Sequence, residues 1–151
     1  MATEIVETAR VTTLVDAPAK QVWSALTDPE AIAEYYLGAK VSTDWKVGHP
    51  ITWSGEWKGK PYQDKGEILA VDPEHELRYS HWSPMGGSED RPENYHCVTV
   101  RLDGTGEGQT RVTLTQSNLD GSVSDEDRQH RDDYEQNWST VLDGLKHVAE
   151  G

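Results

Sequence analysis

The chain has 151 residues and a strong acidic excess, with 27 Asp and Glu residues against 14 Lys and Arg residues. A net charge of −13 repels phosphate backbones and anionic bilayers, so binding to nucleic acids and membranes is disfavoured. The single cysteine, Cys97, excludes an internal disulfide and any site built from several cysteines. No window approaches the length of a membrane span and the N-terminus lacks a signal-peptide pattern, so we expect one cytoplasmic domain over residues 1–151.

The first predicted elements are a strand and two short helices. Residues 8–15 alternate between two faces, which is typical of a strand. Pro18 suits the first turn of a helix that carries Val22 and Leu26 on its apolar side. A second short helix is expected over residues 29–35.

From residue 39 onward the pattern indicates an antiparallel meander. Turn sequences containing Gly, Pro, Asp and His separate short β-type runs, as hairpin connections require. The longest connection, residues 83–94, has the length of a functional lid or a mobile loop. The predicted strands are residues 41–45, 51–57, 63–71, 77–82, 95–102 and 111–116.

One long amphipathic helix is predicted at the C-terminal end. Ser124 is a favourable N-cap, and acidic residues follow it where the helix dipole favours negative charge. The apolar stripe is uneven, since it is mostly polar up to Asn137 and conventional core afterwards. We therefore expect the second half of the helix to close the core and the first half to lie over a wetter space. The stripe consists of Tyr134, Trp138, Val141, Leu142, Leu145 and Val148.

Several motifs resemble those of a known family. Residues 16–30, DAPAKQVWSALTDPE, are similar to the opening motif of the heat-shock protein 90 ATPase activator-like family of the SRPBCC superfamily. Further similarities lie in residues 47–48, 66–73, 77–82 and 108–115 and in Trp138, Leu142 and Leu145. The resemblance implies an α+β helix-grip (START/Bet v-like) fold, in which a curved antiparallel sheet of about six to seven strands wraps around the last helix. It also implies a hydrophobic cavity between the sheet and that helix, and it supplies no catalytic motif.

His81 and His96 are the clearest candidates for chemistry. They flank the 83–94 connection, and a symmetric hairpin places His81 opposite His96 and Tyr79 opposite Val98 on one inward face. Directly opposed side chains have Cβ atoms about 4.5–5.5 Å apart, which is close enough to share a proton or a ligand. The pair is interpreted either as half-solvated structural residues or as ligand contacts. Acid–base catalysis and metal binding are less favoured, because the spacing supplies no third metal ligand.

Aromatic and polar residues complete the predicted binding surface. Trp53 and Trp57 share a strand face with Gly55, and a glycine between two large rings allows close approach of another group, although core packing also explains this face. Gln116 either directs its amide into the cavity or marks the end of its strand. The predicted cavity lining is Trp53, Tyr79, His81, His96, Val98, Gln116, Tyr134, Trp138 and Leu142, and we assign no catalytic residue, metal ligand or cofactor.

These observations leave three functional hypotheses. The first is a non-enzymatic protein that binds a hydrophobic or aromatic small molecule between the last helix and the sheet. The second is an interaction protein that modulates a chaperone or another ATPase. The third is a polyketide cyclase-like enzyme or a hydrolase that uses His81 or His96. The sequence contains no phosphate-binding loop, nucleophile elbow or His-Glu-x-x-His motif.

Overall fold

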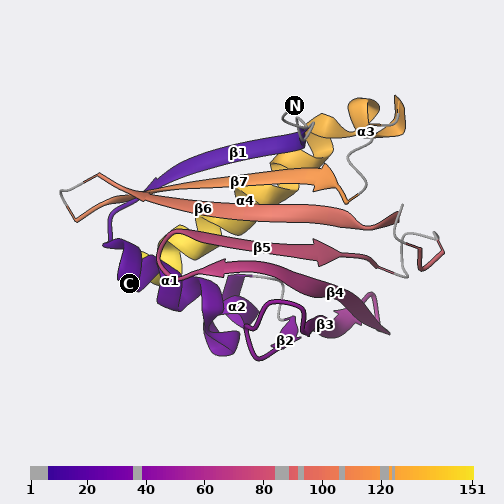
Figure 1. Ribbon diagram of the computed structural model, residues 1–151, viewed down its shortest axis with the longest axis horizontal. Helices are drawn as coiled ribbons and strands as arrows, with labels where there is room; N and C mark the ends of the chain where they lie inside the picture. Colours follow the sequence, from indigo (N-terminus) through magenta and orange to yellow (C-terminus); the bar gives the residue numbers. More distant parts are fainter. Residues whose placement is uncertain are drawn as a thin grey trace.

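The protein folds into a seven-stranded antiparallel sheet with its C-terminal helix packed across one face (Figure 1). The computed structural model describes residues 7–35, 39–83, 89–91, 94–105, 108–119, 123 and 125–151, without the side chains of Glu7, Trp57 and Glu126. The strand order is β1-β7-β6-β5-β4-β3-β2, so only the β1–β7 pair joins strands that are distant in sequence. The predicted α+β helix-grip architecture is confirmed.

Two short helices follow the first strand, as the sequence predicts.

The β3–β4 connection is shorter than expected, because Lys58 and Gly59 both have positive φ and form a two-residue hairpin turn. The strands are β1 (Glu7–Val15), β2 (Lys40–Ser42), β3 (Pro50–Trp57), β4 (Lys60–Asp72), β5 (Glu76–His81), β6 (His96–Gly104) and β7 (Thr110–Asn118). The helices are α1 (Ala19–Thr27), α2 (Pro29–Tyr35), α3 (Asp125–Gln129) and α4 (Arg131–Glu150).

The second strand ends earlier than predicted. We expected it to extend to Trp45, but β2 ends at Ser42. The Thr43 hydroxyl accepts a hydrogen bond from the Trp45 amide at 3.3 Å, and the Asp44 carboxylate accepts one from the Lys46 amide at 3.1 Å. These side chains satisfy the backbone locally and turn the chain away from the sheet.

The prediction of one continuous C-terminal helix is wrong. The chain breaks at His130 into the short helix α3 and the long helix α4, while the predicted N-cap, Ser124, lies outside the described residues. Asp127 of α3 is buried and accepts a hydrogen bond from the Asn118 amide group at 2.7 Å. This contact attaches α3 to the end of β7. It also buries Asp127, one of the acidic residues expected in the first turn of the helix.

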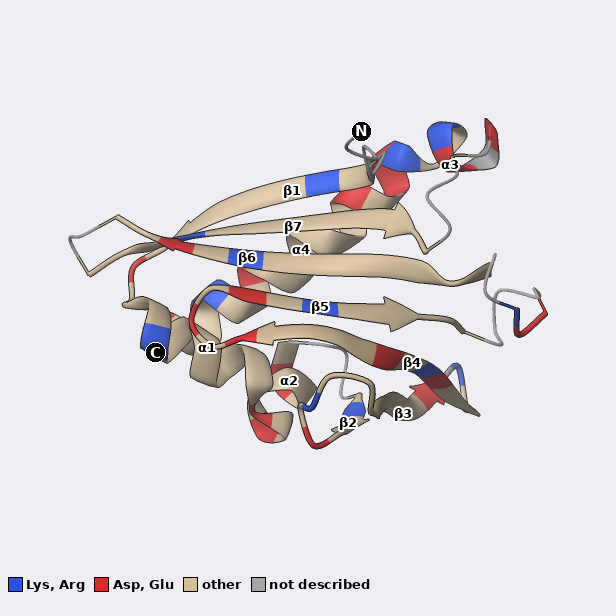
Figure 2. Cartoon of the chain, viewed as in Figure 1, with Lys and Arg blue, Asp and Glu red and all other residues tan. Residues whose placement is uncertain are grey.

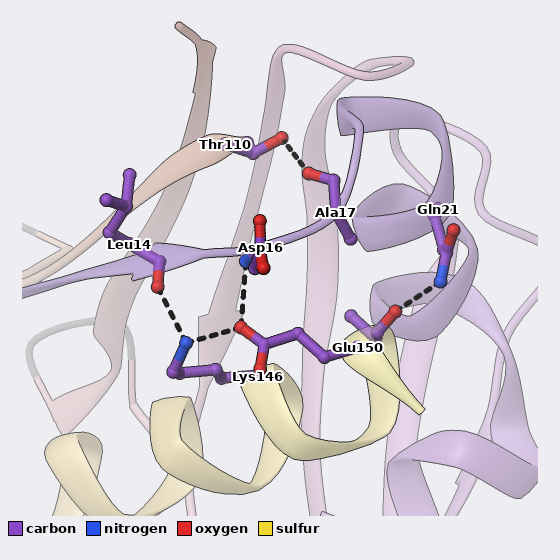
Figure 3. Close-up of polar contacts among 8 residues, drawn as sticks. Leu14, Asp16, Ala17, Gln21, Thr110, Lys146 and Glu150 are labelled. Atoms are coloured by element: carbon purple, nitrogen blue, oxygen red, sulfur yellow. Dashed lines mark hydrogen bonds and ion pairs between the residues drawn. The ribbon is translucent and has the colours of Figure 1, made fainter. Parts of the chain in front are cut away.

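The C-terminal end of α4 is fastened to the chain segment that follows β1 (Figure 3). Glu150 accepts a hydrogen bond from the Asp16 amide at 2.7 Å and also pairs with Lys146. Gln21 of α1 donates to the Ala149 carbonyl in the last turn of α4. The opening motif therefore has a structural role, because it closes one end of the fold against the final helix.

The inner face of the sheet changes from apolar to polar along its strands. The predicted pairing of β5 and β6 is confirmed: Tyr79 lies opposite Val98 and His81 opposite His96. Leu77 begins the same face at the apolar end of β5. The histidines lie at the opposite end, where β5 leads into the 83–94 connection. The inner face thus offers an apolar region with a polar margin.

The outer face of the sheet carries basic residues, although the chain as a whole is acidic. Arg10, Arg78 and Arg101 lie on β1, β5 and β6 on the face turned away from α4, and acidic residues mark many of the helices and turns (Figure 2). None of the helices within the described ranges combines the length and the hydropathy that a membrane crossing requires. The outer face is polar and hydroxyl-rich, which leaves the inner face as the place for an apolar ligand.

Candidate ligand cavity

An apolar cavity lies between α4, α2 and the inner face of the sheet. Its volume is about 40 Å³, which is room for about three water molecules and far less than the roughly 300 Å³ at which typical ligand pockets begin. A ligand of ordinary size can therefore enter only if lining side chains move. The lining consists of Leu26, Ile32, Tyr35, Val41, Trp45, Ile51, Trp53, Leu77, Tyr79, Val100, Leu114, Trp138, Val141, Leu142 and Leu145.

Three half-buried aromatic residues of this lining, Tyr35, Trp45 and Trp138, come from different elements of the chain. Trp45 has a φ of 60°, a left-handed conformation that costs a bulky residue roughly 1–2 kcal/mol. Tyr35 packs against Gly144, where an added Cβ would lie only 2.5 Å from the Tyr35 Cβ. Sequence reasoning missed Tyr35 and Trp45 as lining residues, because the turn that brings Trp45 to the cavity depends on backbone conformation.

The nine residues predicted to line the cavity fall into three groups. Four of them line it as it stands, namely Trp53, Tyr79, Trp138 and Leu142. Val98 is fully buried in the core. His81, His96 and Gln116 lie at the polar end of the inner face, with Tyr134 of α4 beside His96, and all four are outside the lining. The predicted set therefore combines the cavity wall with its polar margin.

Gln116 is the centre of a hydrogen-bond network that joins α4 to the sheet. Its side-chain oxygen accepts a hydrogen bond from Trp138 Nε1 at 2.7 Å. Its amide nitrogen lies 3.4 Å from His96 Nδ1 and 3.4 Å from the Thr8 hydroxyl. The amide of Gln116 is thus engaged by neighbouring side chains rather than directed into the cavity.

His96 lies at the polar end, where its surroundings disfavour the protonated imidazole. Burial lowers its pKa below the ordinary value, and the neighbouring His81 lowers it further, whereas Asp127 and Asn118 act in the opposite direction. The ring of Tyr134 on α4 lies beside it, with ring centroids 6.2 Å apart. A neutral ring can accept the hydrogen bond from Gln116 on the neighbouring strand. Through its contact with Tyr134, His96 also takes part in the packing of α4 against the sheet.

His81 forms a separate pair with Asp64, a residue that sequence reasoning did not select. Its Nε2 lies 2.9 Å from Asp64 Oδ2, and both side chains are largely buried. The Asp64 Oδ1 atom is buried and has no hydrogen-bond partner within the described part of the chain. An ionised carboxylate beside an imidazole fixes the ring orientation and can support acid–base chemistry or ligand recognition. Only the alternation of β4 could have indicated that Asp64 faces inward.

The close approach expected at Gly55 comes from the neighbouring strand. Gly55 lies opposite Tyr62 on β4, and a Cβ added to Gly55 would lie 2.8 Å from the Tyr62 hydroxyl oxygen. The Tyr62 ring therefore occupies the space over the glycine. The interpretation of this part of the face as packing is favoured over ligand contact, while the side chain of Trp57 lies outside the described residues.

A sheet that grips a C-terminal helix, with an apolar cavity and a polar margin between them, defines a START-like helix-grip domain. The chain belongs to the family described as activator of Hsp90 ATPase homolog 1-like protein, whose model matches residues 16–150. The family suggested by the sequence motifs is thereby confirmed. No curated protein matches the chain.

Solved structures of similar proteins support the same fold. A solution structure of a protein from Cytophaga hutchinsonii shares 46% identity and a TM-score of 0.77, and the match covers 98% of this chain and 97% of that one. A crystal structure from Chromobacterium violaceum shares 21% identity and a TM-score of 0.70, with 94% and 96% coverage. An Hsp90 activator from Plasmodium falciparum shares 21% identity and a TM-score of 0.58, with 72% and 71% coverage.

Proposed function

We propose that this protein is a cytoplasmic binding protein for a small apolar or aromatic molecule, held between α4 and the inner face of the sheet. The observation that carries the proposal is the apolar cavity, whose lining includes five aromatic residues. Burial of apolar ligand surface there contributes about 25 cal/mol per Å², which is the main driving force available in such a lining. The half-buried rings of Tyr35, Trp45 and Trp138 are the side chains whose displacement makes room.

The proposal is tested by a screen for ligand binding. Lipids, polyketides and aromatic acids are added to the protein, and the melting temperature and the fluorescence of its six tryptophans are recorded. A ligand is expected to raise the melting temperature and to change the emission in a saturable way. If no compound of these classes gives a saturable change, the proposal is wrong.

A matched pair of variants locates the binding. Val141→Phe places a larger side chain in the cavity wall, whereas Ser139→Phe places the same side chain on the exposed side of α4. We expect ligand affinity to fall at least about tenfold in Val141→Phe and to stay unchanged in Ser139→Phe. Equal affinities in both variants would place the ligand elsewhere on the protein.

Modulation of a chaperone ATPase is a second candidate, supported by the description of the family to which the chain belongs. The expected result is direct binding to a heat-shock protein 90 homologue and stimulation of its ATP hydrolysis. A pull-down and an ATPase assay with the purified chaperone measure both effects. Absence of stimulation at saturating concentrations removes this candidate.

A further inference from the structure

The ring of Trp53 lies between the Asp64–His81 pair and the cavity. Asp64 is directly opposite Trp53 in the β3–β4 pairing, so their side chains share the inner face of the sheet. Trp53 is a cavity residue, and its ring centroid lies 5.1 Å from that of His81 and 5.3 Å from that of Tyr79. A ligand that displaces the Trp53 ring or extends past it therefore meets this pair.

The atoms that the pair leaves open are both hydrogen-bond acceptors. His81 Nε2 donates its hydrogen to Asp64 Oδ2 at 2.9 Å, so the other ring nitrogen, Nδ1, carries a lone pair in the neutral imidazole. The remaining carboxylate oxygen, Asp64 Oδ1, is buried and receives no hydrogen bond from the described residues. A buried acceptor without a hydrogen-bond donor lowers the stability of the fold, so a ligand that supplies the donor would stabilise the folded protein.

Two other polar side chains at this end, those of Gln116 and Asn118, already bond to protein groups. The Gln116 side chain accepts a hydrogen bond from Trp138 Nε1 and donates one toward His96. The Asn118 side chain donates a hydrogen bond to Asp127. A ligand carboxylate or phosphate would bring a second negative charge to Asp64 in a largely buried site, which is unfavourable. A hydroxyl or an amino group supplies the hydrogen that both open atoms lack.

We infer that the cavity ligand carries a hydrogen-bond donor, either a hydroxyl or an amino group, attached to its apolar or aromatic body and bound by Asp64 and His81. This inference rests on the proposed function, because it names the polar group of the molecule that the cavity binds. The Trp53 ring beside His81 also favours an amino group in its cationic form.

A series of naphthalenes of similar size tests the inference in the wild-type protein. The compounds are 2-methylnaphthalene, 2-naphthol, 2-naphthylmethylamine, 2-methoxynaphthalene and 2-naphthoate, with affinities measured by calorimetry at neutral pH. We expect 2-naphthol, 2-naphthylmethylamine or both to bind at least about tenfold more tightly than 2-methylnaphthalene, as a hydrogen bond to a charged group allows. The hydroxyl and the amine distinguish the two kinds of donor.

The outcomes separate this inference from the proposed function. Equal affinity for the donor compounds and for 2-methoxynaphthalene overturns the inference, while binding of 2-methylnaphthalene still supports an apolar ligand. Preference for 2-naphthoate also overturns it, since the polar end would then recognise an anion. If none of the compounds binds, the inference fails, while the proposed function is decided by the wider screen of lipids, polyketides and aromatic acids.

Two variants assign the preference to Asp64. Asp64→Asn keeps the shape but removes the charge, so the donor preference is expected to disappear while the affinity for 2-methylnaphthalene stays the same. Asp44→Asn is the matched control, because Asp44 forms an exposed carboxylate–imidazole pair with His49 at 2.6 Å and lies outside the cavity lining. A preference that survives in Asp64→Asn, or that is lost equally in Asp44→Asn, overturns the assignment.

A spectroscopic measurement keeps the test independent of how well Asp64→Asn folds. In wild-type protein with labelled histidine nitrogens, the donor compound that binds more tightly, 2-naphthol or 2-naphthylmethylamine, is expected to shift the Nδ1 resonance of His81, while 2-methoxynaphthalene is not. The Nδ1 resonance of His49 serves as the internal reference, because that atom is already paired with Asp44. Absence of a shift at His81 with both 2-naphthol and 2-naphthylmethylamine overturns the inference.

Discussion

Asp64 on β4 contacts His81 on β5, with Oδ2 2.9 Å from Nε2, two residues from Gly66, where the backbone of β5 leaves no room for a side chain. The β4–β5 register shifts between Ile68 and Ala70, and the pairing resumes beyond Gly66 at a bridge between Lys65 and Trp82. A side chain at position 66 would occupy the space now filled by the backbone of β5. The glycine therefore allows β5 to approach β4 beside the polar pair.

Replacement of Gly66 by alanine is expected to cost about 3 kcal/mol of stability or more. An added Cβ would lie 1.7 Å from the carbonyl oxygen of Ser80, a backbone atom that can move only if the strands separate. Urea denaturation measures the loss. Gly104→Ala is the control, because a Cβ at Gly104 meets nothing within 4 Å and stability there should change by less than about 0.5 kcal/mol. Equal stability of the two variants would show that β4 and β5 are farther apart.

The hydrogen bond between Trp138 and Gln116 is expected to contribute measurably to the packing of α4. Trp138→Phe removes the donor and leaves the Gln116 oxygen, in a side chain that is 5% exposed, without that partner. The expected cost is about 1–3 kcal/mol in the free energy of unfolding. A double-mutant cycle with Gln116→Met should give a coupling energy of about 1 kcal/mol or more. A coupling energy near zero would mean that the two side chains do not interact.

Stability is expected to decrease as the pH falls below about 6.5, the ordinary pKa of histidine. Burial, aided by His81, lowers the pKa of His96 in the folded protein, so the unfolded chain binds a proton at a higher pH than the folded protein does. The contribution is fully present above the unfolded pKa. It decreases as the pH falls from there toward the lower folded pKa.

Urea denaturation between about pH 5 and pH 8 measures this dependence. His96→Gln should flatten the profile relative to wild type, because the titrating group is removed. The control, His75→Gln, changes an exposed residue in the β4–β5 turn and should leave the profile unchanged. An identical acid-side slope in wild type and His96→Gln would contradict the prediction.

The parts of the fold that sequence reasoning predicted depend on regular periodicity. The opposition of His81 and His96 follows from the alternation of two strands and a symmetric connection, and the structure confirms it. Leu142 and Trp138 were placed at the cavity by helical spacing, and both line it. Periodicity identifies which side chains face inward, and this was sufficient for the part of the cavity wall formed by Trp53, Tyr79, Trp138 and Leu142.

The parts that were missed depend on single side-chain contacts. The break at His130 accompanies the contact between Asp127 and Asn118, two polar residues that no apolar periodicity identifies. Asp64 was overlooked because its role depends on the close strand approach at Gly66 and on the position of His81. Such contacts join elements whose relative placement is set only by the complete fold, so one sequence does not specify them.

Enlarging the cavity should lower the stability of the protein and raise its affinity for the ligand. Leu142→Ala removes a side chain that is 2% exposed and lines the cavity, and the expected loss is about 2–5 kcal/mol. The extra volume should strengthen binding of 2-methylnaphthalene, since fewer side chains must then be displaced. Leu102→Ala is the matched control, because Leu102 is equally buried but lies outside the lining. Calorimetry and urea denaturation of both variants separate the two effects, and a gain in affinity that is equal in both would show that the ligand does not occupy this cavity.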